Sequence, residues 1–336
     1  MDGQTEVVSG ETARRPRRGR WWLIALATSV VVVATGIVFA LRTPSPVGHW
    51  DSAAGRDRFV RAYAAAFADL PVPQRTIDVR TDFGVVRVYR FAGSGDASAP
   101  LVLLPGRASA SPVWADNLPS LLRVGDVYTV DLLGEPGMSV QDRPIGDDGD
   151  QARWLHQTLD GLPEDRFHLV GLSIGGWTAV NLAVRQPELI ATLTVIDPVY
   201  VFADMPIGTI LRSLPAALPW LPKSWRDGFN SWTAGGAPVE DVPVADMIEA
   251  GMRHYTLRLP QPTRIGPDAL AGLDMPVLAV IAGNSVMHDG HAAAATAERV
   301  LPDGTVRLYP GASHALNGEH PDEIAADIAG FLRQAR

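Results

Sequence analysis

The chain has 336 residues, 46% of them hydrophobic and 20% charged, which is typical of a folded globular protein and excludes wholesale disorder. Its formal net charge of −8 argues against a nucleic-acid partner, which would require a basic face. The absence of cysteine excludes disulfide bonds, thiolate nucleophiles and cysteine-bound metals.

The N-terminal region contains an uncharged, apolar run over residues 21–41, directly after an arginine cluster. About 20 apolar residues cross the ~30 Å hydrocarbon layer as a helix, and such a cluster stays on the cytoplasmic side. The alternative is a cleaved signal peptide, whose apolar region is normally shorter and ends in a small-residue cleavage site. We therefore expect residues 1–20 to be a cytoplasmic tail, residues 21–41 a single-pass anchor in the cell membrane, and the remainder to be extracytoplasmic.

Residues 42–75 are expected to form a linker and an amphipathic helix. The linker is the Pro-rich stretch RTPSPVG at 42–48, which favours an extended chain. The helix is predicted over 57–71, where apolar residues recur at helical spacing. From Gln74 onward, two β-rich runs on either side of Asp82-Phe83-Gly84 predict a hairpin.

From residue 76 to the C-terminus, short apolar runs alternate with helical stretches. Continuous apolar runs bounded by Gly and Pro are typical of strands buried on both faces, so a mostly parallel central sheet with flanking helices is predicted. The alternation breaks over about 199–272, a Pro- and Trp-rich segment that predicts a helical cap insertion. The predicted strands are 100–106, 126–134, 167–173, 191–198, 276–283 and 305–311.

A candidate nucleophile lies where one of these strands meets a helix, in the G-x-S-x-G run of residues 171–175 centred on Ser173. On a strand–turn–helix, this pattern has a mechanical reason. The sharp turn exposes the serine, the small residues avoid a clash, and the helix N-terminus favours developing negative charge. The alternative interpretation is an ordinary Gly-rich turn with a serine near the helix N-cap.

Residues 76–336 resemble the α/β-hydrolase fold family, with Ser173 at the nucleophile position. The run LLPGRASASPVW resembles the family's glycine turn after the third strand, which implies an oxyanion hole. By that resemblance, its N–H donors are those of Ile174 and of Arg107 or Ala108. The set of motifs looks closest to bacterial carboxylesterases.

The same resemblance places the catalytic base at His314, within YPGASHALNGEHP. His314 follows the last predicted strand and a Pro-Gly turn, so it can face the nucleophile. His320 is the alternative, but it precedes Pro321 and the terminal helix, which suits a surface position. The run VDLLGEPGMS resembles the loop after the fourth strand, where the acidic residue, here Asp131, is usually structural.

The catalytic acid departs from the family's pattern, because Val286 stands where the family's loop after strand seven carries a carboxylate. Asp197 follows an apolar strand directly, at the sheet edge where ligand chemistry collects in α/β proteins. It could instead be an Asp-Pro turn residue. Asp289 lies in the strand-seven loop, but a helix N-cap would explain it equally. We predict Asp197 as the acid, with Asp289 in reserve.

Together these features predict a serine hydrolase that cleaves small-molecule or lipid esters through an acyl-enzyme, with the triad Ser173, His314 and Asp197. No metal or organic cofactor is implied. Two alternatives stay open. One is related chemistry on the same fold, such as hydrolysis of thioesters, lipids or C–C bonds. The other is a non-catalytic binding module, suggested by the missing strand-seven acid.

Overall fold

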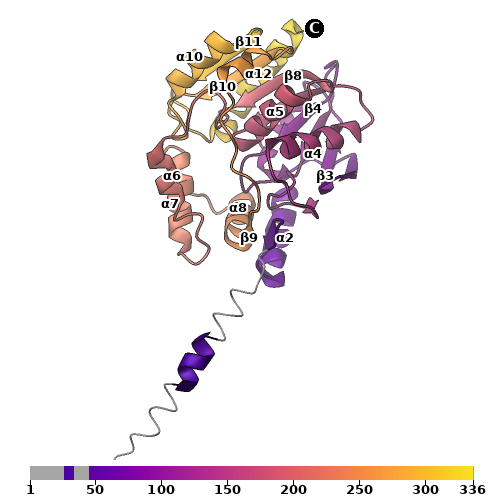
Figure 1. Cartoon of the computed structure of the whole chain (residues 1–336). Helices are drawn as coiled ribbons and strands as arrows, with labels where there is room; N and C mark the ends of the chain where they lie inside the picture. Colours follow the sequence, from indigo (N-terminus) through magenta and orange to yellow (C-terminus); the bar gives the residue numbers. More distant parts are fainter. Residues whose placement is uncertain (1–25, 34–44, 336) are drawn as a thin grey trace, which may run out of the picture. The chain divides into compact units, whose positions relative to one another are not determined.

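The computed structural model describes residues 26–33 and 45–335 (Figure 1). The chain divides into two units near Ser45, and the larger unit begins at Pro46. Residues 26–33 are helical, with exposed side chains. Within these described ranges, no helix is long and apolar enough to cross a membrane. The predicted anchor over residues 21–41 lies mostly outside them.

The main sheet has the order β11-β10-β8-β7-β4-β5-β3-β2, with β6 beside β3. The strands from β11 to β5 run parallel, whereas β2, β3 and β6 pair antiparallel. Each predicted apolar run overlaps one of the parallel strands, which confirms that part of the prediction. The strands are β2 (Arg75–Thr81), β3 (Gly84–Phe91), β4 (Leu101–Leu104), β5 (Val127–Val130), β6 (Val140–Gln141), β7 (Phe167–Leu172), β8 (Ile190–Ile196), β10 (Val277–Ala282) and β11 (Gly304–Tyr309).

Helices cover both faces of this sheet and produce two apolar cores. Alternate residues of a strand face opposite sides, so Val102 and Leu104 join one core while Leu101 and Leu103 join the other. This explains why the central strands are apolar without interruption. The helices are α2 (Ala53–Phe67), α3 (Leu118–Leu121), α4 (Asp148–Asp160), α5 (Ile174–Arg185), α6 (Ile207–Ser213), α7 (Lys223–Thr233), α8 (Pro243–His254), α9 (Pro267–Ala271), α10 (Gly290–Val300), α11 (Leu316–Glu319) and α12 (Pro321–Gln334), with a 3-10 turn η1 (Ser111–Trp114).

The first helix, α2, packs into the larger unit through its apolar face. Phe59 and Tyr63 are buried in the second core, and Ser52 caps the helix by accepting from the Gly55 N–H. Just before α2, strand β1 (His49–Trp50) pairs antiparallel with β9 (Tyr255–Thr256). This small sheet ties the start of the unit to the end of α8.

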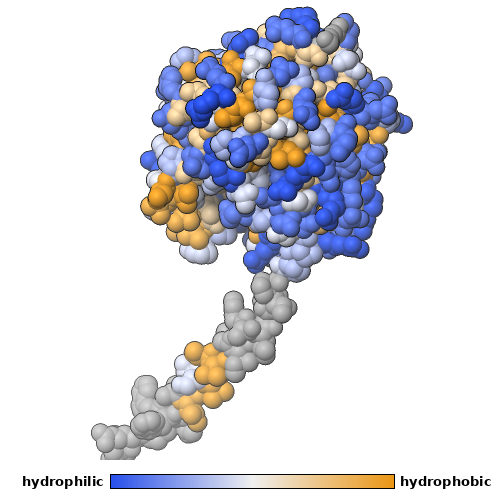
Figure 2. All heavy atoms as spheres, turned by 45° about the horizontal axis from the view of Figure 1, so that its top comes forward, coloured by the Kyte–Doolittle hydropathy of each residue, from blue (hydrophilic) through white to orange (hydrophobic). Residues whose placement is uncertain are grey.

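The insertion between β8 and β10 contains α6, α7, α8, β9 and α9. Its helix α8 is anchored, because Met247 and Ala250 are buried in the second core. In contrast, α6, the link to α7 and the first turn of α7 leave large apolar side chains exposed, and this end of the molecule is visibly apolar in Figure 2. The exposed residues are Ile207, Ile210, Leu211, Leu214, Trp220 and Trp225.

Candidate active site

Ser173 occupies the sharp turn between β7 and α5, with φ 54° and ψ −115°. This backbone conformation is unfavourable for a residue that has a Cβ, so the surroundings must enforce it. The neighbouring glycines allow the close approach. A Cβ on Gly171 would lie 2.4 Å from the Gly175 carbonyl oxygen, and a Cβ on Gly175 would lie 2.2 Å from the Leu104 carbonyl oxygen. The turn therefore holds the hydroxyl at the carboxyl end of the sheet, above the N-terminus of α5.

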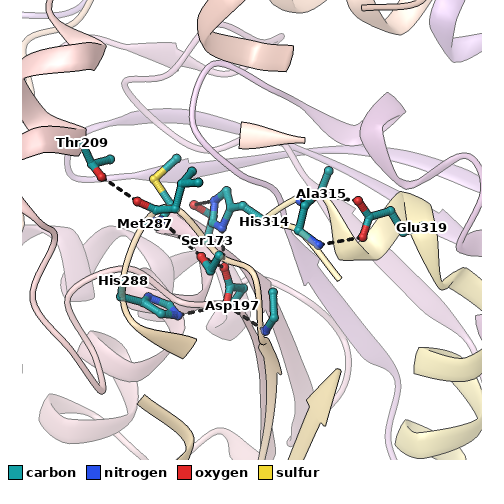
Figure 3. Close-up of polar contacts among 12 residues, drawn as sticks. Ser173, Asp197, Thr209, Met287, His288, His314, Ala315 and Glu319 are labelled. Atoms are coloured by element: carbon teal, nitrogen blue, oxygen red, sulfur yellow. Dashed lines mark hydrogen bonds and ion pairs between the residues drawn. The ribbon is translucent and has the colours of Figure 1, made fainter. Parts of the chain in front are cut away.

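His314 lies on the loop between β11 and α11 and faces Ser173 (Figure 3). Its Nε2 is 2.9 Å from Ser173 Oγ, and its Nδ1 is 2.6 Å from Asp197 Oδ2. Glu319 braces the loop by accepting from the Ser313 N–H at 2.9 Å and from its hydroxyl at 2.5 Å. His320 instead lies against the Tyr309 ring, with the ring centroids 5.2 Å apart. The structure thus brings His314 to the serine, and not the alternative His320.

Asp197 follows β8 directly, has φ 42°, and is completely buried. Its Oδ1 accepts from the Ala282 N–H at 3.0 Å and lies 3.0 Å from His288 Nε2. Its Oδ2 accepts from the Ser285 hydroxyl at 2.6 Å and contacts His314 as described above. Four donors therefore surround a group that offers about four lone-pair positions, which saturates the carboxylate.

These donors keep Asp197 ionised. Burial by itself raises the pKa of Asp197, but hydrogen bonds from His288 and His314, and the positive charge of either ring when it is protonated, hold the pKa below its usual range. An ionised carboxylate only accepts hydrogen bonds, so the His314 nitrogen facing it carries a proton. In the neutral ring, the opposite nitrogen then presents its lone pair to the Ser173 hydroxyl. This is the tautomer that a general base for Ser173 requires.

The reserve acid, Asp289, is not brought to His314. It is exposed and caps α10, where its Oδ1 accepts from the Ala292 N–H at 3.0 Å. Val286 lies in the same loop, and its carbonyl accepts from the Thr209 hydroxyl of α6 at 2.6 Å. The loop after β10 thus contributes no carboxylate to the cluster around His314, although it supplies two of the donors to Asp197.

The predicted oxyanion donors differ in whether they are engaged. The Ala108 N–H donates to Glu135 Oε2 at 3.1 Å and is therefore engaged by a side chain. The N–H groups of Arg107 and Ile174 have no hydrogen-bond acceptor in residues 45–335. The Arg107 side chain is held by Glu135, with Nη1 3.0 Å from Oε1. Arg107 and Ile174 also line one small cavity, together with Trp177 of α5.

Comparison with known proteins gives the family of the chain. A model of the alpha/beta hydrolase family matches residues 101–327, more than half of the chain. The chain belongs to the alpha/beta hydrolase family. This identity confirms the fold predicted from the motifs around Ser173 and His314.

Two curated relatives of this hydrolase come from Bacillus subtilis (strain 168). One is named uncharacterized carboxylesterase nap and is 25% identical over 282 residues, covering 82% of this chain and 92% of the relative. The other, carboxylesterase YbfK, is 25% identical over 285 residues, covering 82% and 93%. Among solved structures, the Bacillus subtilis naproxen esterase (carboxylesterase NP) has a TM-score of 0.76 at 24% identity, covering 84% of this chain and 99% of that chain.

Three residues of this α/β-hydrolase site were not singled out by the sequence. Glu135 contacts the oxyanion turn, while Ser285 and His288 reach Asp197 from the loop after β10. The partners of these contacts are separated by 27, 88 and 91 positions. No local motif encodes pairs so distant. The only available signal was that Ser285 and His288 flank the place where the family carries its acid.

Proposed function

We propose that this protein hydrolyses carboxylic esters, with Ser173 as the nucleophile, His314 as the general base and acid, and Asp197 as the carboxylate that orients His314. One observation carries the proposal: the continuous hydrogen-bonded path from Ser173 Oγ through the His314 ring to Asp197 Oδ2. The carboxylesterase relatives bear out the broader prediction of an ester-hydrolysing enzyme.

In the acylation step, His314 Nε2 accepts the hydroxyl proton while Ser173 Oγ bonds to the ester carbonyl carbon. The resulting imidazolium is stabilised by Asp197, whose ionised state is already secured by its donors. Collapse of the tetrahedral intermediate breaks the bond to the alcohol oxygen. That oxygen takes the proton back from His314, which leaves an acyl ester on Ser173.

In the deacylation step, His314 accepts a proton from water, and the hydroxide oxygen bonds to the acyl carbon. The Ser173 Oγ–acyl bond then breaks, and Ser173 recovers its proton from His314. In both steps we assign stabilisation of the negative oxygen to the unengaged N–H groups of Ile174 and Arg107. Removing one donor of this kind costs about 10²–10³-fold in kcat in a well-studied protease.

A direct experiment measures hydrolysis of p-nitrophenyl esters of increasing acyl length by the full-length protein in detergent, beside Ser173→Ala. We expect turnover by the native protein and its loss in the variant. Turnover of thioesters or C–C substrates with negligible ester turnover would instead favour the related chemistry. A folded native protein inactive on all of them would favour the binding module.

We also propose that residues 21–41 anchor the chain in the cell membrane and that the hydrolase domain is extracytoplasmic. The uncharged apolar run and the arginine cluster before it support this. Protease added to intact spheroplasts should digest the domain while a cytoplasmic marker stays intact. Protection of the domain, or recovery of a soluble form beginning near Arg42, would contradict the proposal.

A further inference from the structure

The second imidazole on Asp197 has no place in the mechanism described so far. His288 comes from the loop after β10 and is 3% exposed. Its Nε2 lies 3.0 Å from Asp197 Oδ1, while His314 contacts Oδ2 (Figure 3). The carboxylate is therefore held between two rings, only one of which reaches Ser173.

The protonation of His288 follows from the state of Asp197. Because the ionised carboxylate only accepts, the Nε2 of His288 must carry the donated proton. The other ring nitrogen, Nδ1, is buried and has no hydrogen-bond partner within the described part of the chain. A buried polar atom left in this way is unfavourable. An apolar side chain of similar size would avoid that cost, so the contact with Asp197 is what distinguishes histidine here.

We propose that His288 is a positioning residue of the triad: its Nε2–H fixes Asp197 Oδ1, so that Oδ2 is presented to His314, and keeps the carboxylate ionised. This inference rests on the proposed function, since it gives His288 a part in orienting the same base. His288 touches neither the nucleophile nor the substrate in this account. Its effect passes entirely through Asp197.

The pattern of donors on Asp197 supports this role. Each carboxylate oxygen receives one imidazole and one smaller donor, the Ala282 N–H on Oδ1 and the Ser285 hydroxyl on Oδ2. Loss of His288 leaves Oδ1 with a single donor, so the carboxylate can rotate away from His314. It also removes one of the interactions that oppose the effect of burial.

The other charged groups nearby are already engaged. On the loop after β10, Asp289 turns its carboxylate to the N-terminus of α10. On the loop that carries His314, Glu319 accepts from Ser313. In residues 45–335, the titratable groups in contact with Asp197 are thus the two histidines. A pH-dependent change after substitution of His288 is therefore attributable to this cluster.

The test compares two substitutions in the full-length protein in detergent. His288→Leu removes the donor and keeps an apolar side chain of comparable size. His288→Gln keeps an N–H near the position of Nε2. We expect kcat of the Leu variant to fall on the order of 10- to 100-fold with KM nearly unchanged, the size of effect found when an outer partner that orients a metal-binding side chain is removed. The Gln variant should recover most of kcat.

The pH profile separates positioning from a merely structural role. In this mechanism the acid limb of kcat/KM marks the pH at which the base, His314, takes up a proton. Without the His288 donor the negative charge of Asp197 is less compensated and favours that proton more strongly, so the limb should move to higher pH in the Leu variant. In the Gln variant the limb should stay near its native position. A structural defect would lower the active fraction equally at every pH and would leave the limb in place.

A matched control is His168 of β7, also buried, whose Nδ1 is 3.0 Å from Thr192 Oγ1 at the opposite end of the strand from Ser173. His168→Leu should lower stability without moving the acid limb. Native kcat and an unmoved limb in folded His288→Leu would overturn the inference.

A further variant, His288→Asn, guards against misfolding of the Leu variant, because its shorter amide does not reach Asp197. If the Asn and Gln variants have the same kcat and the same acid limb of kcat/KM, the inference is overturned. Unfolding of both the Leu and Asn variants would show that His288 is needed for folding and would also overturn the inference. An inactive native protein would overturn the proposed function as well, whereas an active native protein with unaffected His288 variants overturns this inference alone.

Discussion

Two buried aspartates, Asp131 and Asp197, hold equivalent positions at the ends of parallel strands but have different hydrogen-bond donors around them. Each directly follows a parallel strand, β5 or β8, and each is completely buried. Each also accepts four hydrogen bonds. Those of Asp131 come from the N–H and hydroxyl of Ser111, the Tyr63 hydroxyl and the Met138 N–H. They connect α2 and η1 to the loop after β5, whereas two of the donors to Asp197 are imidazoles.

The difference in donors reverses the effect of the same burial. Burial raises the pKa of Asp131, and its hydroxyl and amide donors only oppose that rise in part. The pKa of Asp197 stays below its usual range, because two rings that can carry positive charge face it. The comparison teaches that burial and the number of hydrogen bonds do not decide the charge of a buried carboxylate. The chemical kind of the donors does.

The largest expected loss of kcat comes from removing the two residues that Asp197 serves, Ser173 and His314. Ser173→Ala and His314→Ala should each lower kcat by roughly 10⁴- to 10⁶-fold, and the double variant should be no worse, because triad members act as a unit. Steady-state hydrolysis by protein of verified fold is the measurement. Additive losses in the double variant would show that Ser173 and His314 do not act together.

The second prediction compares the same substitution, Asp to Asn, at Asp197 and at Asp131. Asp197→Asn keeps the shape but allows the wrong tautomer of His314, so kcat should fall by about 10⁴-fold, as in a well-studied protease. Asp131→Asn should leave kcat of the folded protein within a few-fold. It should lower stability by about 1–3 kcal/mol, because an amide cannot accept from all four donors. Denaturant midpoints and kcat, measured on both variants, are compared. Equal losses of kcat in the two would remove the distinction.

A third prediction uses pH. The folded pKa of Asp197 lies below the unfolded value of about 3.9, so its ionisation stabilises the fold above about pH 4, and that contribution is lost as pH falls through the folded pKa. The folded pKa of Asp131 lies above the unfolded value. The stability that its protonated carboxyl contributes is therefore present below about pH 3.9 and is lost as pH rises through the folded pKa.

Thermal midpoints measured between pH 3 and 7 test this reversal. The stability difference between the native protein and Asp197→Asn should narrow as pH falls below about 4. The difference for Asp131→Asn should widen as pH falls towards that value. Parallel pH dependences of the two differences would contradict the opposite directions of the two pKa shifts.

The smallest effect concerns Asp289, the carboxylate that the structure leaves outside the cluster. Asp289→Ala removes the cap of α10 and should cost about 1 kcal/mol of stability, with kcat unchanged. Asp289→Asn, an equally good cap, is the control and should be near native in both measurements. A large loss of kcat in Asp289→Asn, with near-native Asp197→Asn, would return the acid to the loop after β10.

The predictable part of the fold and site was encoded locally. The apolar strands, the G-x-S-x-G turn at Ser173 and the Pro-Gly turn before His314 each follow from a short run of residues. Asp197 was inferred from its place after a strand, although the same rule describes Asp131 equally well. Only the partners separate the two, and those partners arrive from distant segments.

What the sequence did not reveal depends on chain paths between elements. The loop after β10 reaches the end of β8 because the two strands are neighbours in the sheet, and this places Ser285 and His288 against Asp197. Likewise, the Ala108 N–H is engaged because the Glu135 side chain folds back onto it. No periodicity or motif in the sequence predicts either of these contacts.

The central claim is that Ser173 is activated through His314 and Asp197, with Asp131 uninvolved. The most direct measurement is the rate at which a fluorophosphonate labels the folded full-length protein, with the labelled residue located by peptide mass spectrometry. We predict labelling of Ser173 in the native protein, a similar rate in Asp131→Asn, and labelling slowed by orders of magnitude in Asp197→Asn. Labelling at another residue, or equal rates in Asp197→Asn and the native protein, would contradict the account.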